Sequence, residues 1–152
     1  MKNKSLLPEI NAEIEKTRIV GFIKQTLFDQ KIENAVIGMS GGIDSTVSFY
    51  LLKEILPLKN IFVAHLYFDK PIFENIDKIL KDIKFPIGNI THVSIKSSVT
   101  QITKNFKINH SEASRVRIGN ISARVRMIML FDLAKKHNAL VIGTENKSEN
   151  LL

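Results

Sequence analysis

The chain has 152 residues, of which 44% are hydrophobic and 24% charged, a composition that is ordinary for globular proteins and excludes a disordered or fibrous class. It has no cysteine, which excludes disulfides, thiolate zinc sites and cysteine nucleophiles and fits a reducing compartment. The formal net charge of +7 favours an anionic partner, although a solvated lysine-rich surface accounts for that charge equally well.

The N-terminal stretch MKNKSLLPEINAEIEK has no apolar run of signal-peptide length, and no segment approaches the ~18 apolar residues that a membrane span requires. We therefore expect a soluble, cytoplasmic protein that does not enter a membrane. The length suits one domain, and no internal repeat, low-complexity tract or linker interrupts residues 1–152.

The predicted elements alternate between helix and strand. Ile10, Ile14, Ile23 and Leu27 lie close to helical spacing and predict a leading amphipathic helix. Short apolar runs between helix breakers then predict four buried strands, at residues 34–39, 60–66, 89–95 and 139–144. Helices are predicted at residues 45–56, 72–84, 97–106 and 120–137. This alternation is typical of βαβ units, so the predicted fold class is α/β, a doubly wound parallel sheet covered on both faces.

Two of the predicted strands end in glycine-marked loops. GMSGGIDS follows the first strand, and GTENKSEN follows the fourth. In the common strand order 3-2-1-4 these two strands are neighbours at the point where the order reverses, which is where ligands bind in such sheets. We therefore expect the two loops to face each other across a binding site.

The first of these loops has the composition of an anion site. Adjacent glycines let successive N–H groups point into one concavity, and the N-terminus of the following helix adds its dipole. Ser40 and Ser45 can donate hydrogen bonds to phosphate oxygens, whereas Asp44 would repel phosphate unless a cation lay between them, which implies magnesium. Neither GxxxxGK[ST] nor GxGxxG occurs in the chain. The alternative is a glycine turn in which Asp44 or Ser45 only caps the helix.

SGGIDS resembles the pyrophosphatase loop of the adenine-nucleotide α-hydrolases, also called the PP-loop ATP pyrophosphatases. The stretch GNISARVRMIMLFDLAKKHNALVIGTENKSENLL (residues 119–152) is similar to the matching segment of the ammonia-dependent NAD synthetases. The resemblance covers nearly the whole chain but only the first part of that family's domain. It implies a Rossmann-like synthetase domain at residues 1–152, truncated at its C-terminus, whose fifth strand lies beyond Leu152.

The resemblance implies ATP-dependent amidation of deamido-NAD to NAD by ammonia, through an adenylated intermediate and with release of pyrophosphate and AMP. It assigns Asp44 and Glu149 to Mg²⁺ and to catalysis, Thr144 to ATP, and Arg124 to deamido-NAD. The ATP loop itself would comprise Gly38, Met39, Ser40, Gly41, Gly42, Ile43, Asp44 and Ser45. The expected partners are these small molecules rather than nucleic acid, with a homodimer for the full-length form.

Two of these residues also allow simpler interpretations. Arg124 could be a boundary arginine paired with a carboxylate, and Glu149 could be a first-turn helix carboxylate after Ser148. The four histidines, His65, His92, His110 and His137, lack the spacing of a metal site and are expected to be structural or solvated.

Some features depart from the family. The loop LYFDKPIFEN (residues 66–75) contains no arginine to contact ATP, and the chain stops soon after Glu149. We therefore expect the 152 residues alone to be inactive in NAD synthesis. The absence of a glutaminase domain implies free ammonia or nitrogen from another chain. The alternatives are another adenylating enzyme of the superfamily, GMP synthetase-like or tRNA-modifying, and a noncatalytic nucleotide-binding module.

Overall fold

A parallel sheet forms the centre of the structure, a computed structural model that describes residues 10–69, 73–109 and 111–143. Its strands, in the spatial order β3-β2-β1-β4, are β1 (Asn34–Gly38), β2 (Ile61–Tyr67), β3 (Ile90–Ser94) and β4 (Ala139–Ile142). Ile37 of β1 is in register with Val63 of β2 on one side and with Ile142 of β4 on the other. The expected strand order 3-2-1-4 is therefore confirmed, and β1 and β4 meet at the switch point.

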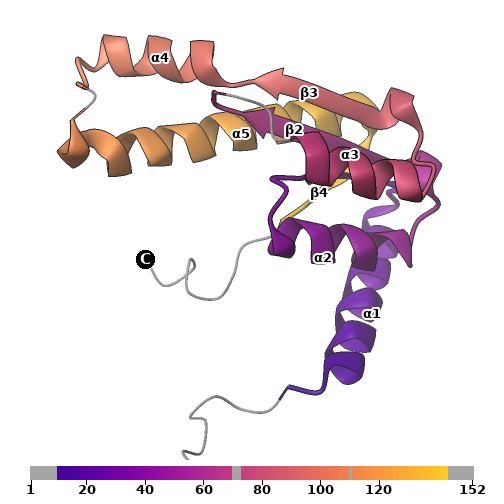
Figure 1. The fold of residues 1–152 in the computed structure, drawn as a ribbon. Helices are drawn as coiled ribbons and strands as arrows, with labels where there is room; N and C mark the ends of the chain where they lie inside the picture. The colour runs from indigo at the N-terminus through magenta and orange to yellow at the C-terminus, as the bar shows by residue number, and fades with distance from the viewer. Residues whose placement is uncertain (1–9, 70–72, 110, 144–152) are drawn as a thin grey trace, which may run out of the picture.

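Helices cover both faces of this sheet. They are α1 (Ala12–Gln30), α2 (Ile43–Lys53), α3 (Phe73–Asp82), α4 (Lys96–Asn105) and α5 (Arg115–His137). In Figure 1, α2 and α3 cover the side of the sheet nearer the viewer, α5 runs behind it, and α4 lies beside α5. No helix in the described part of the chain is both long and apolar enough to cross a membrane.

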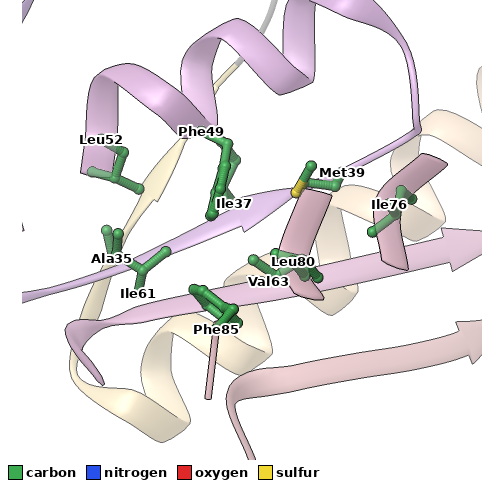
Figure 2. Packing of buried hydrophobic residues seen from close by; sticks show 10 residues of the cluster. All are labelled: Ala35, Ile37, Met39, Phe49, Leu52, Ile61, Val63, Ile76, Leu80 and Phe85. Atoms are coloured by element: carbon green, nitrogen blue, oxygen red, sulfur yellow. The ribbon is translucent and has the colours of Figure 1, made fainter. Parts of the chain in front are cut away.

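The core is divided by the sheet into two clusters. The first lies between the sheet and α2 and α3 and contains the residues in Figure 2, which are Ala35, Ile37, Met39, Phe49, Leu52, Ile61, Val63, Ile76, Leu80 and Phe85. The second lies against α4 and α5 and contains Ala64, Leu66, Ile95, Val99 and Val125. Alternate β2 residues serve the two clusters because successive side chains of a strand point to opposite faces.

Two sequence-based expectations need correction. Ile10 and Ile14 are 73% and 63% exposed, and of the apolar residues that predicted the leading helix only Leu27 is buried. In Figure 1 the N-terminal part of α1 extends away from the sheet, so the sheet does not cover this part of the helix. The last helix begins at Arg115 rather than near residue 120, because a short 3-10 helix, Glu112–Ser114, leads directly into it.

Cations gather at the ends of the helices. Lysines occupy the last turns of four helices, at Lys53, Lys81, Lys104 and the pair Lys135 and Lys136. Positive charge at a helix C-terminus stabilises the helix dipole, by about 0.3–1 kcal/mol per charge at exposed positions. Part of the basic excess therefore has a structural explanation.

Asparagine side chains join the strands along the amino edge of the sheet. Asn89, just before β3, donates to the carbonyls of Lys59 and Ile61 at 2.9 and 3.0 Å. Asn60, just before β2, donates to the Asn34 side-chain oxygen at 2.9 Å and to the Glu33 carbonyl at 3.1 Å. This edge therefore has a side-chain hydrogen bond between each of these neighbouring pairs of strands.

The same row continues to the last strand. Asn34, the first residue of β1, donates to the His137 carbonyl at 2.8 Å, and His137 ends α5 just before β4. The row thus runs from β3 to the start of β4 and fixes how far each strand is shifted along its axis relative to its neighbours. Because this shift determines where each strand ends, the row also helps to place the loops at the opposite edge.

We predict that Asn60→Ala lowers the free energy of unfolding by about 1–2 kcal/mol, because it leaves two oxygens at the sheet edge without their donor. Urea denaturation monitored by circular dichroism measures the change. Asn105→Ala is the control, since Asn105 lies exposed at the end of α4 and accepts only a 3.4 Å hydrogen bond from Gln101. Equal effects of the two substitutions would show that the row contributes nothing.

Candidate functional site

The glycine loop, residues 38–45, leaves β1 and enters α2 at the carboxyl edge of the sheet. Gly41 has φ +85°, a conformation that side-chain-bearing residues rarely adopt. At Gly38 a Cβ would lie 3.3 Å from Cδ1 of Leu130, so α5 packs closely against the end of β1. The first glycine thus permits close helix packing, and the second permits the turn.

Two serines hold this loop together. The Ser45 hydroxyl donates to the Gly42 carbonyl at 3.1 Å and accepts the Ser40 backbone N–H at 3.3 Å. The Ser40 hydroxyl lies 3.2 Å from that of Ser45 and accepts the Gly42 N–H at 3.2 Å. The hydroxyls therefore fix the loop, and Ser45 is only 4% exposed.

The N-terminus of α2 opens at this loop. Its N-cap, Gly42, provides no side-chain hydrogen bond to the first turn. The first N–H groups of a helix have no partner within the helix, and together with the helix dipole they favour an anion. The structure thus places the glycine turn and the uncapped start of α2 together, and phosphate binding at this loop stays a prediction.

Asp44 lies exposed in the first turn of α2. An exposed carboxylate beside a phosphate site suits Mg²⁺, which commonly takes one or two protein carboxylates and completes its shell with phosphate oxygens and water. The described residues contain no group of three histidine or acidic side chains that could hold a metal. Among the described residues, Asp44 is thus a single exposed carboxylate beside the glycine loop.

A cavity of about 510 Å³ adjoins the glycine loop. Its walls come from the ends of β1, β2 and β4 and from one face of α5. They include Gly38, Met39 and Ser40 from the first strand end and Ile142 and Gly143 from the fourth. The two glycine-marked strand ends therefore line one cavity, as far as Gly143. The volume falls within the range of small-ligand sites.

Arg124 lies on α5 outside the walls of this cavity. Its side chain is exposed and donates from Nη1 to the Asn120 carbonyl, one turn earlier, at 3.0 Å. It makes no ion pair with a carboxylate among the described residues, so these residues do not supply the partner of the boundary arginine that the sequence allowed. An exposed guanidinium held by its own helix is available to a ligand on the outer side of α5.

Arg126, two residues further on, is the arginine that lines the cavity. It is half-buried, and its Nε donates to the Leu66 carbonyl at 2.9 Å. Burial lowers the pKa of its guanidinium from the ordinary value. The sequence analysis did not single out this residue, although ARVRM contains both arginines. Two positions apart on a helix, their side chains point in different directions.

Other predicted site residues fall outside the part of the chain that the structure describes. These are Thr144 and Glu149, and His110 lies outside it as well. Among the remaining histidines, His65 is buried on β2 with its ring centroid 5.7 Å from that of His92, and His137 stacks on Phe62 at 3.8 Å. Burial lowers the pKa of both His65 and His137.

Comparison with known proteins places this site in a family. The model of a family described as NAD synthase matches residues 15–152. This chain belongs to the NAD synthase family. The match includes the glycine loop, the helix that carries both arginines, and the C-terminal stretch on which the sequence resemblance rested.

Individual members of the NAD synthase family agree with this result. The chain is 33% identical over 141 residues to an NH(3)-dependent NAD(+) synthetase from Fusobacterium nucleatum, and 32% identical over 151 residues to one from Thermoplasma volcanium. These alignments cover 93% and 96% of the chain but 53% and 57% of the relatives. The chain thus spans about half the length of the curated relatives it matches.

The solved structures agree with the fold. The NH3-dependent NAD synthetase from Campylobacter jejuni, solved in complex with the nitrate ion, superposes with a TM-score of 0.78 at 27% identity. The superposition covers 94% of this chain and 60% of that one. The α/β sheet described above is therefore the architecture of a solved NAD synthetase.

Proposed function

We propose that the protein, in its full-length form, makes NAD by ATP-dependent amidation of deamido-NAD with ammonia. The observation that carries the proposal is the glycine loop at the switch point, in a chain of the NAD synthase family. The nicotinate carboxylate attacks the α-phosphate of ATP, pyrophosphate leaves, and ammonia then displaces AMP from the adenylated intermediate.

The glycine loop binds the leaving pyrophosphate in this proposal. The first-turn N–H groups of α2 face its oxygens, and the serine network keeps them in place before the substrate arrives. Preorganised donors of this kind stabilise developing negative charge without reorganising during the reaction. Magnesium, when bound, would neutralise charge on the leaving group. Asp44 would hold it, together with Glu149, which follows β4 in the sequence.

The remaining predicted residues bind the substrates. Thr144 would contact ATP where β4 ends, next to Gly143 at the cavity wall. Arg124 would bind deamido-NAD on the outer side of α5. We also propose a cytoplasmic homodimer for the full-length protein, with no nucleic acid partner.

A stoichiometric assay tests the function. Full-length protein is incubated with ATP, Mg²⁺, ammonia and deamido-NAD, and NAD, AMP and pyrophosphate are quantified. The proposal requires the three products in equal amounts and no pyrophosphate release without deamido-NAD. ATP turnover without NAD would reject it, and retention on tRNA at moderate salt would favour an RNA-modifying enzyme instead.

We predict that Arg124→Ala weakens deamido-NAD binding by roughly 10- to 150-fold, corresponding to the ~1.5–3 kcal/mol of a hydrogen bond to a charged group. ATP binding should change less than about twofold, because Arg124 lies outside the cavity beside the glycine loop. Titration calorimetry with each ligand measures both. Arg117→Ala is the control, since Arg117 is exposed on the same side of α5 two turns earlier. Equal losses for both ligands would indicate a structural role.

A further inference from the structure

Arg126 hydrogen-bonds to β2 at a position where a neighbouring strand would otherwise supply the donor. The Ala64 carbonyl of β2 accepts the N–H of Met39, just after β1 ends, at 2.9 Å. The Leu66 carbonyl, two residues on, points to the same side, where the chain has left β1 to form the glycine loop. The Nε of Arg126 satisfies this carbonyl at 2.9 Å. The guanidinium is therefore fixed beside the start of the loop.

The position of Arg126 along α5 agrees with this placement. Leu130, one turn later on the same side of the helix, would be 3.3 Å from a Cβ at Gly38. One helical turn spans about 5–6 Å, so Arg126 lies about that far from the level of Gly38. It lines the cavity with Met39 and Ser40, which puts it on the side of the loop.

The charge of Arg126 has no anionic partner in the described part of the chain. None of the ion pairs there includes it, and burial lowers the pKa of its guanidinium. An arginine remains charged at any physiological pH, and its fork still has donors at Nη1 and Nη2 when Nε is occupied. Most other side chains of the cavity wall are apolar. A partly desolvated cation in such a wall favours an anion that enters the cavity.

We propose that Arg126 binds the phosphoryl group of a nucleotide that lies next to the glycine loop, the group that stays on the nucleoside when pyrophosphate leaves. This inference rests on the proposed function, which sets the order of the pyrophosphate, the connecting phosphate and the nucleoside along the bound nucleotide. Pyrophosphate on the loop directs the nucleoside into the adjoining cavity, and the connecting phosphate then passes Arg126. Nη1 and Nη2 can donate to two of its oxygens, a geometry for which arginine is better suited than lysine.

Binding of AMP and of adenosine tests this role directly. AMP carries the phosphoryl group and adenosine lacks it, so the ratio of their affinities reports the subsite. In the full-length protein we expect AMP to bind more tightly than adenosine, and Arg126→Met to weaken AMP by about tenfold or more, as for loss of a charged hydrogen bond. Adenosine should change less than about twofold. Arg117→Met, on an exposed part of the same helix, is the control.

The outcomes distinguish a phosphate-binding role of Arg126 from a purely structural role. If Arg126 only supports the Leu66 carbonyl, Arg126→Met lowers the thermal midpoint and weakens AMP and adenosine equally, which overturns the proposal. A wild-type protein that does not prefer AMP also overturns it. If Arg126→Met does not fold, Arg126→Lys is used instead. We expect this variant to keep a reduced preference for AMP over adenosine. An unchanged preference would contradict the role of the two guanidinium donors.

The binding experiment and the NAD assay of the proposed function together distinguish this inference from that function. Preference for AMP that depends on Arg126, in a protein that forms no NAD, would reject the function and keep the subsite. NAD formation by a protein whose AMP preference survives Arg126→Met would keep the function and reject the subsite.

Discussion

In the full-length protein, Asp44→Asn is expected to lower the rate of magnesium-dependent pyrophosphate release by a factor of about 10² or more while leaving the fold intact. The substitution removes one negative charge and almost no volume from an exposed position in the first turn of α2. Lost stabilisation of charge that develops on the leaving group typically costs ~10²–10³ in rate. The loss of a first-turn carboxylate costs the helix itself only about 0.3–1 kcal/mol.

Steady-state kinetics at saturating ATP over a range of Mg²⁺ concentrations measures this effect. A metal role predicts that the residual activity needs more Mg²⁺ than the wild type does. Asp132→Asn is the matched control, because Asp132 is an exposed carboxylate on α5 that lies outside the cavity wall. Wild-type turnover by the Asp44→Asn variant would exclude Asp44 from the metal site and leave it a helix-capping residue.

The glycine loop was predictable from sequence because its information is local. SGGIDS needs a turn with a left-handed residue, and Gly41 at φ +85° is that residue. The alternation of short apolar runs and helices indicated a parallel sheet, and the strand order was the common one of such sheets. These features depend on neighbours in sequence or on general rules of chain geometry.

The other features depend on which distant groups become neighbours. The asparagine row joins residues 26 to 103 positions apart, and Arg126 meets the Leu66 carbonyl 60 positions away. Nothing in the spacing of ARVRM says which arginine faces the sheet, since that choice depends on the rotation of α5 over β1. The exposed apolar side chains of α1 misled the prediction for the same reason: helical periodicity marks a face but not whether a surface covers it.

The stability of α2 matters for the loop, because α2 supplies the N–H groups of the phosphate site. Phe49 attaches this helix to the core. It is fully buried, and its ring meets that of Phe85 edge-on at 5.7 Å and 64°. Figure 2 shows it directed from α2 towards Ile37 on β1. Its position places one side chain between the helix and the strand that carry the two ends of the glycine loop.

We therefore predict that Phe49→Ala lowers the free energy of unfolding by about 3–5 kcal/mol, from lost apolar burial and an unfilled cavity. Urea denaturation followed by circular dichroism measures it. Phe28→Ala is the control, since Phe28 is 79% exposed and should change stability by no more than about 0.5 kcal/mol. A loss below about 1.5 kcal/mol for Phe49→Ala would show that α2 and the sheet move together and fill the cavity left by the ring. In that case AMP binding below the unfolding transition should persist, because the loop would keep its support from β1 and from its own serines.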